Sequence, residues 1–309
     1  MKFAIVGAGA MGCLYGAHLA RAGNDVTLID IRPDVVHAIN RDGVRVDGVG
    51  GDFHANVAAC APEHAQELAD VVSIHADTRG TVAAADLARR IIAQDGYAIT
   101  FQNGIGNVEA LVEALSPERV LGGVSYNSAS GSGPGRVTHT VARTTWVGEL
   151  QHGETRRVNL LRDAFVQADL ETSVSDNITG VIWNKFVAAC AVNPVAALTG
   201  MIGSQFSRDP SADALQDRIL DELLAVVRAK GVRLADEDPA GSIKRMCRNA
   251  TEKPSMLQHV EAGRLTEIDS HNGAVVRLGQ ALGVPTPYNE AVTLMVKARS
   301  ARMIGDLKV

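Results

Sequence analysis

Residues 7–12 form the feature that most limits how this chain can fold. They read Gly-Ala-Gly-Ala-Met-Gly, a G-x-G-x-x-G pattern that directly follows the β-rich run Phe3–Val6 and precedes a helical pattern. In that setting the first glycine permits a tight turn, the second lets a pyrophosphate approach the backbone, and the third lets helix and strand pack closely. The helix N-terminus adds partial positive charge. The loop therefore predicts dinucleotide binding, and a tight strand-to-helix turn without a ligand is the alternative.

The first half of the chain alternates short β-rich runs with helical patterns. The runs are Phe3–Val6, Val26–Ile29, Val71–Ile74 and Tyr97–Phe101, and apolar residues recur at helical spacing over 14–19 and 82–91. This alternation predicts parallel strands joined by crossover helices in a doubly wound sheet. Between Val120 and Gly148, a Gly-Ser-Gly-Pro-Gly stretch at 131–135 predicts a hairpin or loop excursion on the sheet edge.

The second half has a different pattern. After about Val174 the β signal vanishes, and long helical patterns follow. We expect these helices to be broken at four prolines, Pro194, Pro210, Pro239 and Pro254. Since 309 residues suffice for two domains, the predicted fold class is α/β: an N-terminal Rossmann-like dinucleotide-binding domain over 1–174 and an all-α C-terminal domain, helical and holding the substrate and catalytic residues, over 175–309.

The amino-acid composition excludes several classes of binding partner. The chain has 30 Lys and Arg against 35 Asp and Glu, a formal net charge of −5, and no long basic run, which argues against nucleic acid and anionic membrane as partners. Its four widely spaced cysteines predict reduced thiols, and its scattered histidines predict no metal site. With no signal-peptide layout and no apparent membrane span, we expect a cytoplasmic protein. A homodimer is compatible with the sequence, which does not fix the oligomeric state.

Two charged residues after the second strand bear on the cofactor. A carboxylate at Asp30 would hydrogen-bond the ribose hydroxyls of NAD and repel the 2′-phosphate of NADP. Arg32, two residues on, could still pair with that phosphate. Either side chain could instead be a solvated loop charge. The predicted cofactor is therefore NAD(P)H, with a weak lean to NAD from Asp30.

Lys185 is the one charged side chain in the apolar segment 179–192. If it is buried, loss of hydration lowers its pKa and suits it to proton transfer. A lysine that extends from a surface face of the helix is the alternative. Asn193 lies eight residues further, about 80° round an ideal helix, and could share the side of Lys185 if the helix continues that far.

Three further polar residues are candidates by position. Asn103 follows a predicted strand, at the rim of an α/β sheet where ligands bind. Ser255 stands three residues before Gln258, the spacing of a capping box, with a long helix expected to about Leu282. Glu267 lies in an acidic stretch that would by default be a solvated face.

In these residues the chain resembles the ketopantoate reductases (2-dehydropantoate 2-reductases) and related 2-oxo-acid reductases. The resemblance runs end to end. Its motifs are the loop of Gly7, Ala8, Gly9, Ala10, Met11 and Gly12, the sequence Gln-Asn-Gly-Ile-Gly at 102–106, Trp-Asn-Lys-Phe at 183–186 with Asn193-Pro194, and Ser-Met-Leu-Gln at 255–258 leading to Thr-Glu-Ile-Asp at 266–269.

The resemblance implies a role for each candidate. Lys185 matches the catalytic lysine, which protonates the ketone oxygen while the nicotinamide delivers hydride to C2, and Glu267 matches its acidic partner. It also implies a substrate bound between a Rossmann-like domain and a helical domain. The implied substrate-binding residues are Asn103, Asn193 and Ser255, and the implied cofactor-binding residues are Gly7, Ala8, Gly9, Ala10, Met11, Gly12, Asp30, Arg32, His75 and Asn103.

Three positions depart from the family pattern. Ala189 replaces a second substrate-binding asparagine, which removes polar contacts and enlarges the pocket. His75 replaces a lysine near the cofactor with a weaker, pH-dependent cation. His259 replaces a common aspartate. These changes suggest a paralogue with an altered substrate or cofactor.

Ketopantoate reduction to pantoate, in pantothenate biosynthesis, is the reaction that the resemblance favours. An NAD-linked dehydrogenase of another 2-hydroxy acid, of the mandelate type, is the alternative that Ala189 and Asp30 support. A nucleotide sensor without catalysis is a third alternative. The retained site residues argue against a sensor, because a sensor needs none of them.

Overall fold

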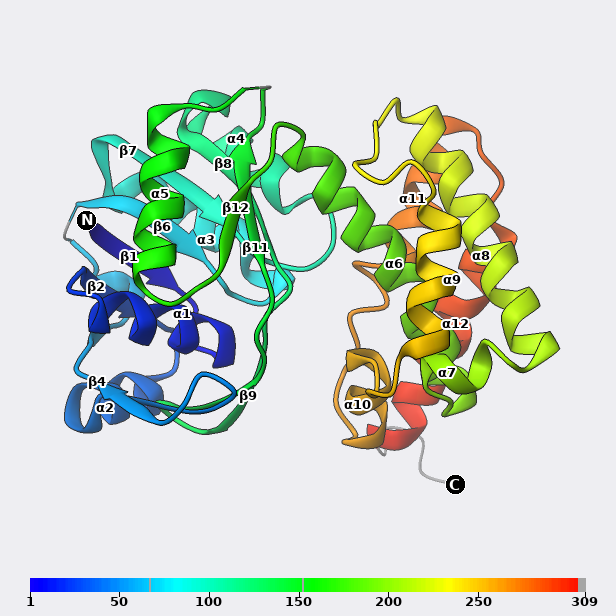
Figure 1. The fold of residues 1–309 in the computed structure, drawn as a ribbon, viewed down its shortest axis with the longest axis horizontal. Helices are drawn as coiled ribbons and strands as arrows, with labels where there is room; N and C mark the ends of the chain where they lie inside the picture. The colour runs from blue at the N-terminus through cyan, green and yellow to red at the C-terminus, as the bar shows by residue number, and fades with distance from the viewer. Residues whose placement is uncertain (67, 152, 305–309) are drawn as a thin grey trace. The chain divides into compact units, whose positions relative to one another are not determined.

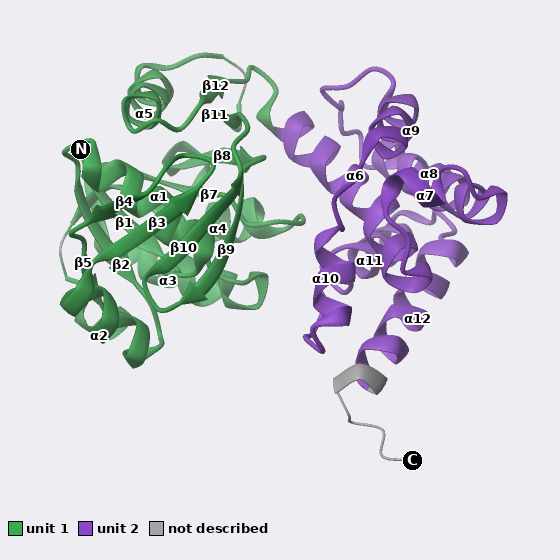
Figure 2. Ribbon diagram, turned by 60° about the horizontal axis from the view of Figure 1, so that its bottom comes forward, with its two compact units in different colours: residues 1–178 green, residues 179–309 purple. Residues whose placement is uncertain are grey.

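The computed structural model describes residues 1–66, 68–151 and 153–304. The chain divides into two compact units, Met1–Ile178 and Thr179–Val309 (Figure 2). The first unit is built on a mostly parallel sheet and the second is helical. The predicted fold class, a Rossmann-like α/β domain followed by a helical domain, is confirmed.

An eight-stranded sheet forms the centre of unit 1 (Figure 1). Its strands, in spatial order, are β12 (Thr172–Val174), β11 (Thr145–Glu149), β8 (Val120–Ser125), β7 (Ile92–Thr100), β6 (Ala69–Ile74), β1 (Lys2–Val6), β2 (Asp25–Ile29) and β5 (Ala58–Cys60). From β5 to β8 all neighbours are parallel, in the 3-2-1-4-5-6 order of a dinucleotide-binding fold. The order reverses between β1 and β6, where such folds bind their ligand.

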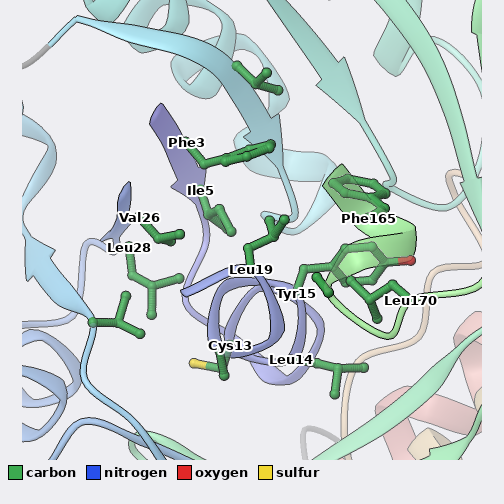
Figure 3. Close-up of a cluster of buried hydrophobic side chains, with 14 of the residues drawn as sticks. Phe3, Ile5, Cys13, Leu14, Tyr15, Leu19, Val26, Leu28, Phe165 and Leu170 are labelled. Atoms are coloured by element: carbon green, nitrogen blue, oxygen red, sulfur yellow. The ribbon is translucent and has the colours of Figure 1, made fainter. Parts of the chain in front are cut away.

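The four predicted strands and two predicted helices of this sheet are confirmed, although β7 begins five residues earlier than the apolar run suggested and ends at Thr100. The helices of unit 1 are α1 (Ala10–Arg21), α2 (Pro33–Asp42), α3 (Thr81–Ile91), α4 (Asn107–Leu115) and α5 (Arg156–Gln167). Figure 3 shows side chains of β1 and α1, among them Phe3, Ile5 and Tyr15, gathered with Phe165 of α5 in one buried cluster. This cluster fixes α1, and with it the Gly-rich loop, on the sheet.

A second, four-stranded sheet corrects the expectation for residues 120–148. The predicted hairpin around residues 131–135 is confirmed, but it is not an excursion on the edge of the main sheet, because β8 and β11, which flank it, are strands of that sheet. The hairpin between them joins a separate sheet of β4 (Phe53–Ala55), β3 (Val44–Gly48), β10 (Arg136–Val141) and β9 (Ser128–Gly133). Helix α1 packs against this sheet as well as against β1 and β2, which a reading of strand and turn signals in isolation does not reveal.

Unit 2 consists of helices. They are α6 (Ile178–Thr199), α7 (Gly203–Phe206), α8 (Pro210–Ala229), α9 (Pro239–Asn249), α10 (Ser255–Glu261), α11 (Asn272–Leu282) and α12 (Pro287–Ile304). Pro210 and Pro239 each begin a helix, as expected of a residue whose missing N–H would be unpaired there. In both helices the preceding aspartate caps the first turn with its side chain.

Three expectations for unit 2 are wrong. Pro194 does not end its helix but lies inside α6. Ser255 does not cap α10, because Pro254 is the cap residue and no side-chain cap bond forms. The helix after Ser255 also ends at Glu261 rather than near Leu282, and α11 begins only at Asn272.

Helix α6 is the element that bears on the expectation of no apparent membrane span. It has 22 residues and a mean hydropathy of 1.4 over its most apolar window, enough by length and composition to cross a bilayer. Three polar residues, Asn184, Lys185 and Asn193, interrupt its apolar sequence, so the sequence shows no continuous apolar run of that length. Of that window, 61% lies buried within the fold, as in the core helix of a soluble protein.

Candidate active site

The Gly-rich loop has the geometry that a bound pyrophosphate requires. Gly7 has φ +102°, and a Cβ there would lie 2.6 Å from the Ala76 nitrogen. A Cβ on Gly12 would lie 1.9 Å from the Gly7 carbonyl oxygen, whereas one on Gly9 would meet no atom within 4 Å. The first and third glycines are thus required by the fold itself. The second leaves an open surface at the N-terminus of α1, the place where a dinucleotide phosphate binds.

Asp30 is hydrogen-bonded to this loop and to Arg32. Its carboxylate is buried and accepts from the Ala8 N–H at 2.8 Å through Oδ2. Its Oδ1 accepts from the Arg32 N–H and Nε, both at 3.0 Å. The carboxylate is therefore neither a solvated charge nor an unpaired one. The Asp30 carboxylate holds the Gly-rich loop through Ala8. The positive charge of Arg32 beside it lessens the repulsion that Asp30 would exert on a 2′-phosphate.

His75 follows β6 at the carboxyl edge of the sheet, beside the point where the strand order reverses. Its ring packs against those of Tyr15 and Phe101, with centroid distances of 5.1 and 5.3 Å, and these two rings also contact each other. Nε2 is 2.9 Å from the Ser73 hydroxyl oxygen. Burial among these groups lowers the pKa of His75 to about 3. At neutral pH this favours the uncharged ring over the cation expected at this position.

The depressed pKa of His75 makes a prediction about acid stability. A histidine whose pKa is lower in the folded chain contributes stability that is fully present above its unfolded value, 6.5, and is lost as pH falls toward about 3. We expect His75→Phe, which keeps an aromatic ring beside Tyr15 and Phe101, to flatten the acid dependence of the free energy of unfolding by about 1.4 kcal/mol per pH unit. Urea unfolding at several pH values from 7 to 4 measures it. Parallel curves for the variant and the wild type would contradict the assignment.

Gln102 connects the loops after β6 and β7. Its Nε2 donates to the carbonyl of Ala76 and to the hydroxyl of Thr81, each at 2.9 Å. The next residue, Asn103, is exposed at the carboxyl edge of β7, and its carbonyl accepts from Asn107 Nδ2 at 2.9 Å. Asn103 thus lies on the rim that was predicted for it. The bridging role of Gln102 was missed, because nothing in the sequence pairs it with residues 76 and 81.

A cavity of about 280 Å³ adjoins the Gly-rich loop in unit 1. It is lined by the start of α1, including Gly9, by the start of α2, including Asp34, and by the turn from β9 to β10. Two arginines, Arg32 and Arg136, are among its lining residues. Sequence reasoning missed Arg136, since only the second sheet brings the hairpin next to the phosphate loop.

In unit 2, Lys185 and Glu267 interact through charge. Burial lowers the pKa of Lys185 to about 8, and the negative charge of Glu267 opposes that shift. The ring of His271 stacks against Phe186, the neighbour of Lys185, with 15° between the ring planes. A lysine with a pKa near 8 is an acid that gives up and regains a proton readily near neutral pH. Lys185 is partly buried on α6, and its lowered pKa favours a desolvated lysine over one that extends into solvent.

The other candidates of unit 2 are placed differently. Asn193 is buried on α6, two turns beyond Lys185, and the helix continues through it despite the following proline. Ala189, one turn after Lys185, is partly buried. Ser255 is exposed in the first turn of α10.

Comparison with known proteins now identifies the family. A sequence profile described as "Ketopantoate reductase PanE/ApbA" matches residues 3–152, and one described as its C-terminal part matches residues 177–300. The chain belongs to the ketopantoate reductase family. It is 31% identical to the 2-dehydropantoate 2-reductase of Pyrococcus abyssi over 304 residues, which cover 97% of this chain and 98% of that one. As a family member it is an NAD(P)-dependent oxidoreductase that acts on CH–OH groups. The predicted family and the predicted enzyme class are both confirmed.

Two solved structures show how far the likeness to ketopantoate reductases extends. A ketopantoate reductase of this family from Ralstonia eutropha superposes with a TM-score of 0.88 at 33% identity, covering 98% of this chain and all of that one. A D-mandelate dehydrogenase, solved with NADH and anilino(oxo)acetate, has the same TM-score and coverage at 25% identity. The family fold is thus shared by an enzyme named for a 2-oxo acid, ketopantoate, and one named for a 2-hydroxy acid, mandelate.

Proposed function

We propose that the protein reduces a 2-oxo acid to the 2-hydroxy acid with NAD(P)H, with ketopantoate as substrate and pantoate as product, in the cytoplasm. The observation that carries the proposal is Lys185, a partly buried lysine whose pKa is lowered to about 8 and which interacts with the charge of Glu267. Such a group suits proton donation to a ketone oxygen. The names of the curated relatives support the choice of substrate.

Unit 1 supplies the cofactor site of this proposal. The open backbone at Gly9, the amide groups at the start of α1 and the loop-holding carboxylate of Asp30 fit a dinucleotide. His75 and Asn103 lie at the same edge of the sheet, where the carboxyl ends of β6 and β7 meet. When bound, the reduced nicotinamide supplies a hydride to C2 of the substrate.

Unit 2 supplies the acid. As the C2 carbonyl gains a hydride, its oxygen becomes an alkoxide, which the Lys185 ammonium stabilises and then protonates. Glu267 keeps the lysine protonated by its charge. Asn193 and Ser255 are the side chains that we propose for hydrogen bonds to the substrate. The balance is one hydride and one proton added across C=O, which leaves a neutral lysine and an oxidised cofactor.

The identity of the 2-oxo acid is the second element of the proposal. Ala189 offers no hydrogen bond to a substrate hydroxyl, and the D-mandelate dehydrogenase likeness shows that this fold accepts an aromatic substrate. An enzyme of that type is therefore the second candidate. Initial rates of NADPH and NADH oxidation with ketopantoate, pyruvate, 2-oxoisovalerate and benzoylformate decide between them. We expect ketopantoate to give the highest kcat/KM, and a preference for benzoylformate would favour the second candidate.

We further propose that the cofactor's 2′-phosphate binds in the cavity lined by Arg32 and Arg136. The weak lean to NAD rested on the charge of Asp30, which the structure shows paired with Arg32. The cavity lies beside the phosphate loop and brings a second arginine, from the β9–β10 hairpin. Two guanidinium groups favour a phosphate over a bare ribose hydroxyl. These observations support NADPH as the cofactor.

Three variants test this cofactor assignment. Arg136→Ala should lower kcat/KM for NADPH roughly tenfold, the effect of about 1.4 kcal/mol, with little change for NADH. Asp30→Asn, which keeps an acceptor for the Ala8 N–H, should raise the NADPH to NADH ratio. Asp34→Asn removes a second negative charge from the lining of the same cavity and should raise the ratio too. Equal losses for both cofactors in Arg136→Ala would show that the arginine does not bind the 2′-phosphate.

A further inference from the structure

The segment 267–272 is fastened to α6 at two points by side chains outside the proposed chemistry. His271 is buried, and its ring lies 6.3 Å, centroid to centroid, from the ring of Phe186. Asn272 is fully buried, and its Nδ2 donates to the Cys190 carbonyl at 3.0 Å. Phe186 directly follows Lys185, and Cys190 lies five residues after it. Both contacts are therefore made to the helix that carries the proposed acid.

Pro194 explains why α6 accepts a side-chain donor. Proline has no N–H, so the carbonyl four residues earlier, that of Cys190, lacks its helical partner. Asn272 replaces that partner, which allows α6 to continue through the proline. The Asn272 amide is itself held, because it also donates to Asn289 Oδ1 at 3.0 Å, and Asn289 Nδ2 donates to Glu222 Oε2 at 2.8 Å. The link thus joins α6 and α11 to α12 and α8.

His271 fixes the other end of the segment. Its Nδ1 is 2.8 Å from the Glu267 carbonyl oxygen, and its backbone N–H donates to the same oxygen at 3.1 Å. Because a carbonyl only accepts, Nδ1 carries the proton in this contact. The backbone of Glu267 is therefore held by the residue whose ring rests on Phe186. Through these contacts the position of Glu267 is set relative to α6.

We propose that His271 and Asn272 are positioning residues, which hold the carboxylate of Glu267 at a fixed separation from the ammonium of Lys185. The inference rests on the proposed function, in which Lys185 is the general acid. Neither residue is required to touch substrate or cofactor. A role confined to stabilising the helices of unit 2 is the alternative that the experiment must distinguish.

The two roles differ in their effect on the pH profile. Burial lowers the pKa of Lys185 and the charge of Glu267 raises it, so a Glu267 that moves away lets the pKa fall. Two cations beside this segment contact Asp269: Lys297 is ion-paired with its carboxylate, and Arg277 donates to its carbonyl. Since only the protonated lysine can donate, weaker positioning moves the alkaline decline of kcat to lower pH. Loss of stability alone does not move it.

Asn272→Ala is the primary test, assayed as kcat against pH from 6 to 10 on protein shown by circular dichroism to be folded. We expect the alkaline decline to move down by roughly half a pH unit or more, less than the full effect of a nearby opposite charge. In a Glu267→Gln background the same substitution should cause no further shift. Ile243→Ala, which removes buried volume from α9 where it packs on α7, is the control: it lowers stability and should leave the decline in place.

His271→Phe is the second variant, and it decides the question if Asn272→Ala does not fold. It keeps a ring on Phe186 and removes the Nδ1 hydrogen bond to Glu267, so the decline should move in the same direction. A decline at the wild-type pH in the folded variants would overturn the inference. Failure of the proposed function has a different signature: wild-type kcat without an alkaline decline, or full turnover by Lys185→Ala.

Discussion

Lys185→Ala should lower kcat by about 10² or more, the lower end of the contribution of a general acid, with a smaller effect on KM. The physical reason is that the alkoxide formed at C2 loses both a stabilising positive charge and its proton donor. In the wild type we expect kcat to fall as pH rises through about 8, because the deprotonated amine cannot donate. In the variant this alkaline decline should be absent. Steady-state assays with ketopantoate across pH 6 to 10 measure both effects.

A second lysine of unit 2 provides the control for the loss of charge. Lys244 on α9 is ion-paired with Asp213 and Asp217, each at 2.7 Å, so its removal also deletes an ammonium from this unit. Lys244→Ala should leave kcat and its pH profile unchanged. A small primary amine added to Lys185→Ala should restore part of the rate, since it replaces the missing acid. If Lys185→Ala turns over at the wild-type rate, the proposed mechanism is wrong.

The parts of the molecule that could be predicted from sequence are those set by local pattern. The loop of residues 7–12 and its flanking strand and helix follow from backbone sterics, because only glycine fits at Gly7 and Gly12. The strands of the main sheet follow from short β-rich runs between helical patterns. The apolar setting of Lys185 was also visible in the sequence, since it is the one charge in a long apolar stretch.

The parts that could not be predicted depend on partners far away in the chain. The sequence predicted a helix end at Pro194, because the side chain that replaces the missing N–H donor, Asn272, lies 78 residues later in another helix. Asp30 read as a ribose ligand, and its hydrogen bond to the Ala8 N–H becomes visible only when the two strand ends lie side by side. Nothing in the sequence around Arg136 pointed to the cavity, because its strand, β10, pairs with β3, which lies far away in the chain. Local sequence propensity contains no information about any of these contacts.

The glycines of the phosphate loop give the other large expected effect, and they separate fold from cofactor binding. In Gly12→Ala the new methyl would lie 1.9 Å from the Gly7 carbonyl oxygen, so helix α1 must shift off the strand. We expect a loss of about 3 kcal/mol, the upper end of the overpacking range. For a unit of this size that corresponds to a Tm lower by roughly 6–12 °C. Thermal denaturation followed by circular dichroism measures it.

Gly9→Ala is the matched variant, because it adds the same methyl group without a steric conflict in the free protein. Gly9 has φ −76°, and its Cβ would meet no atom within 4 Å. Its Tm should therefore equal that of the wild type. The methyl would stand where the backbone must approach the pyrophosphate, so NADPH affinity in a fluorescence titration should fall by tenfold or more. Wild-type affinity in Gly9→Ala would mean that the dinucleotide does not lie on this loop. A wild-type Tm in Gly12→Ala would mean that the close packing of helix and strand does not fix the loop.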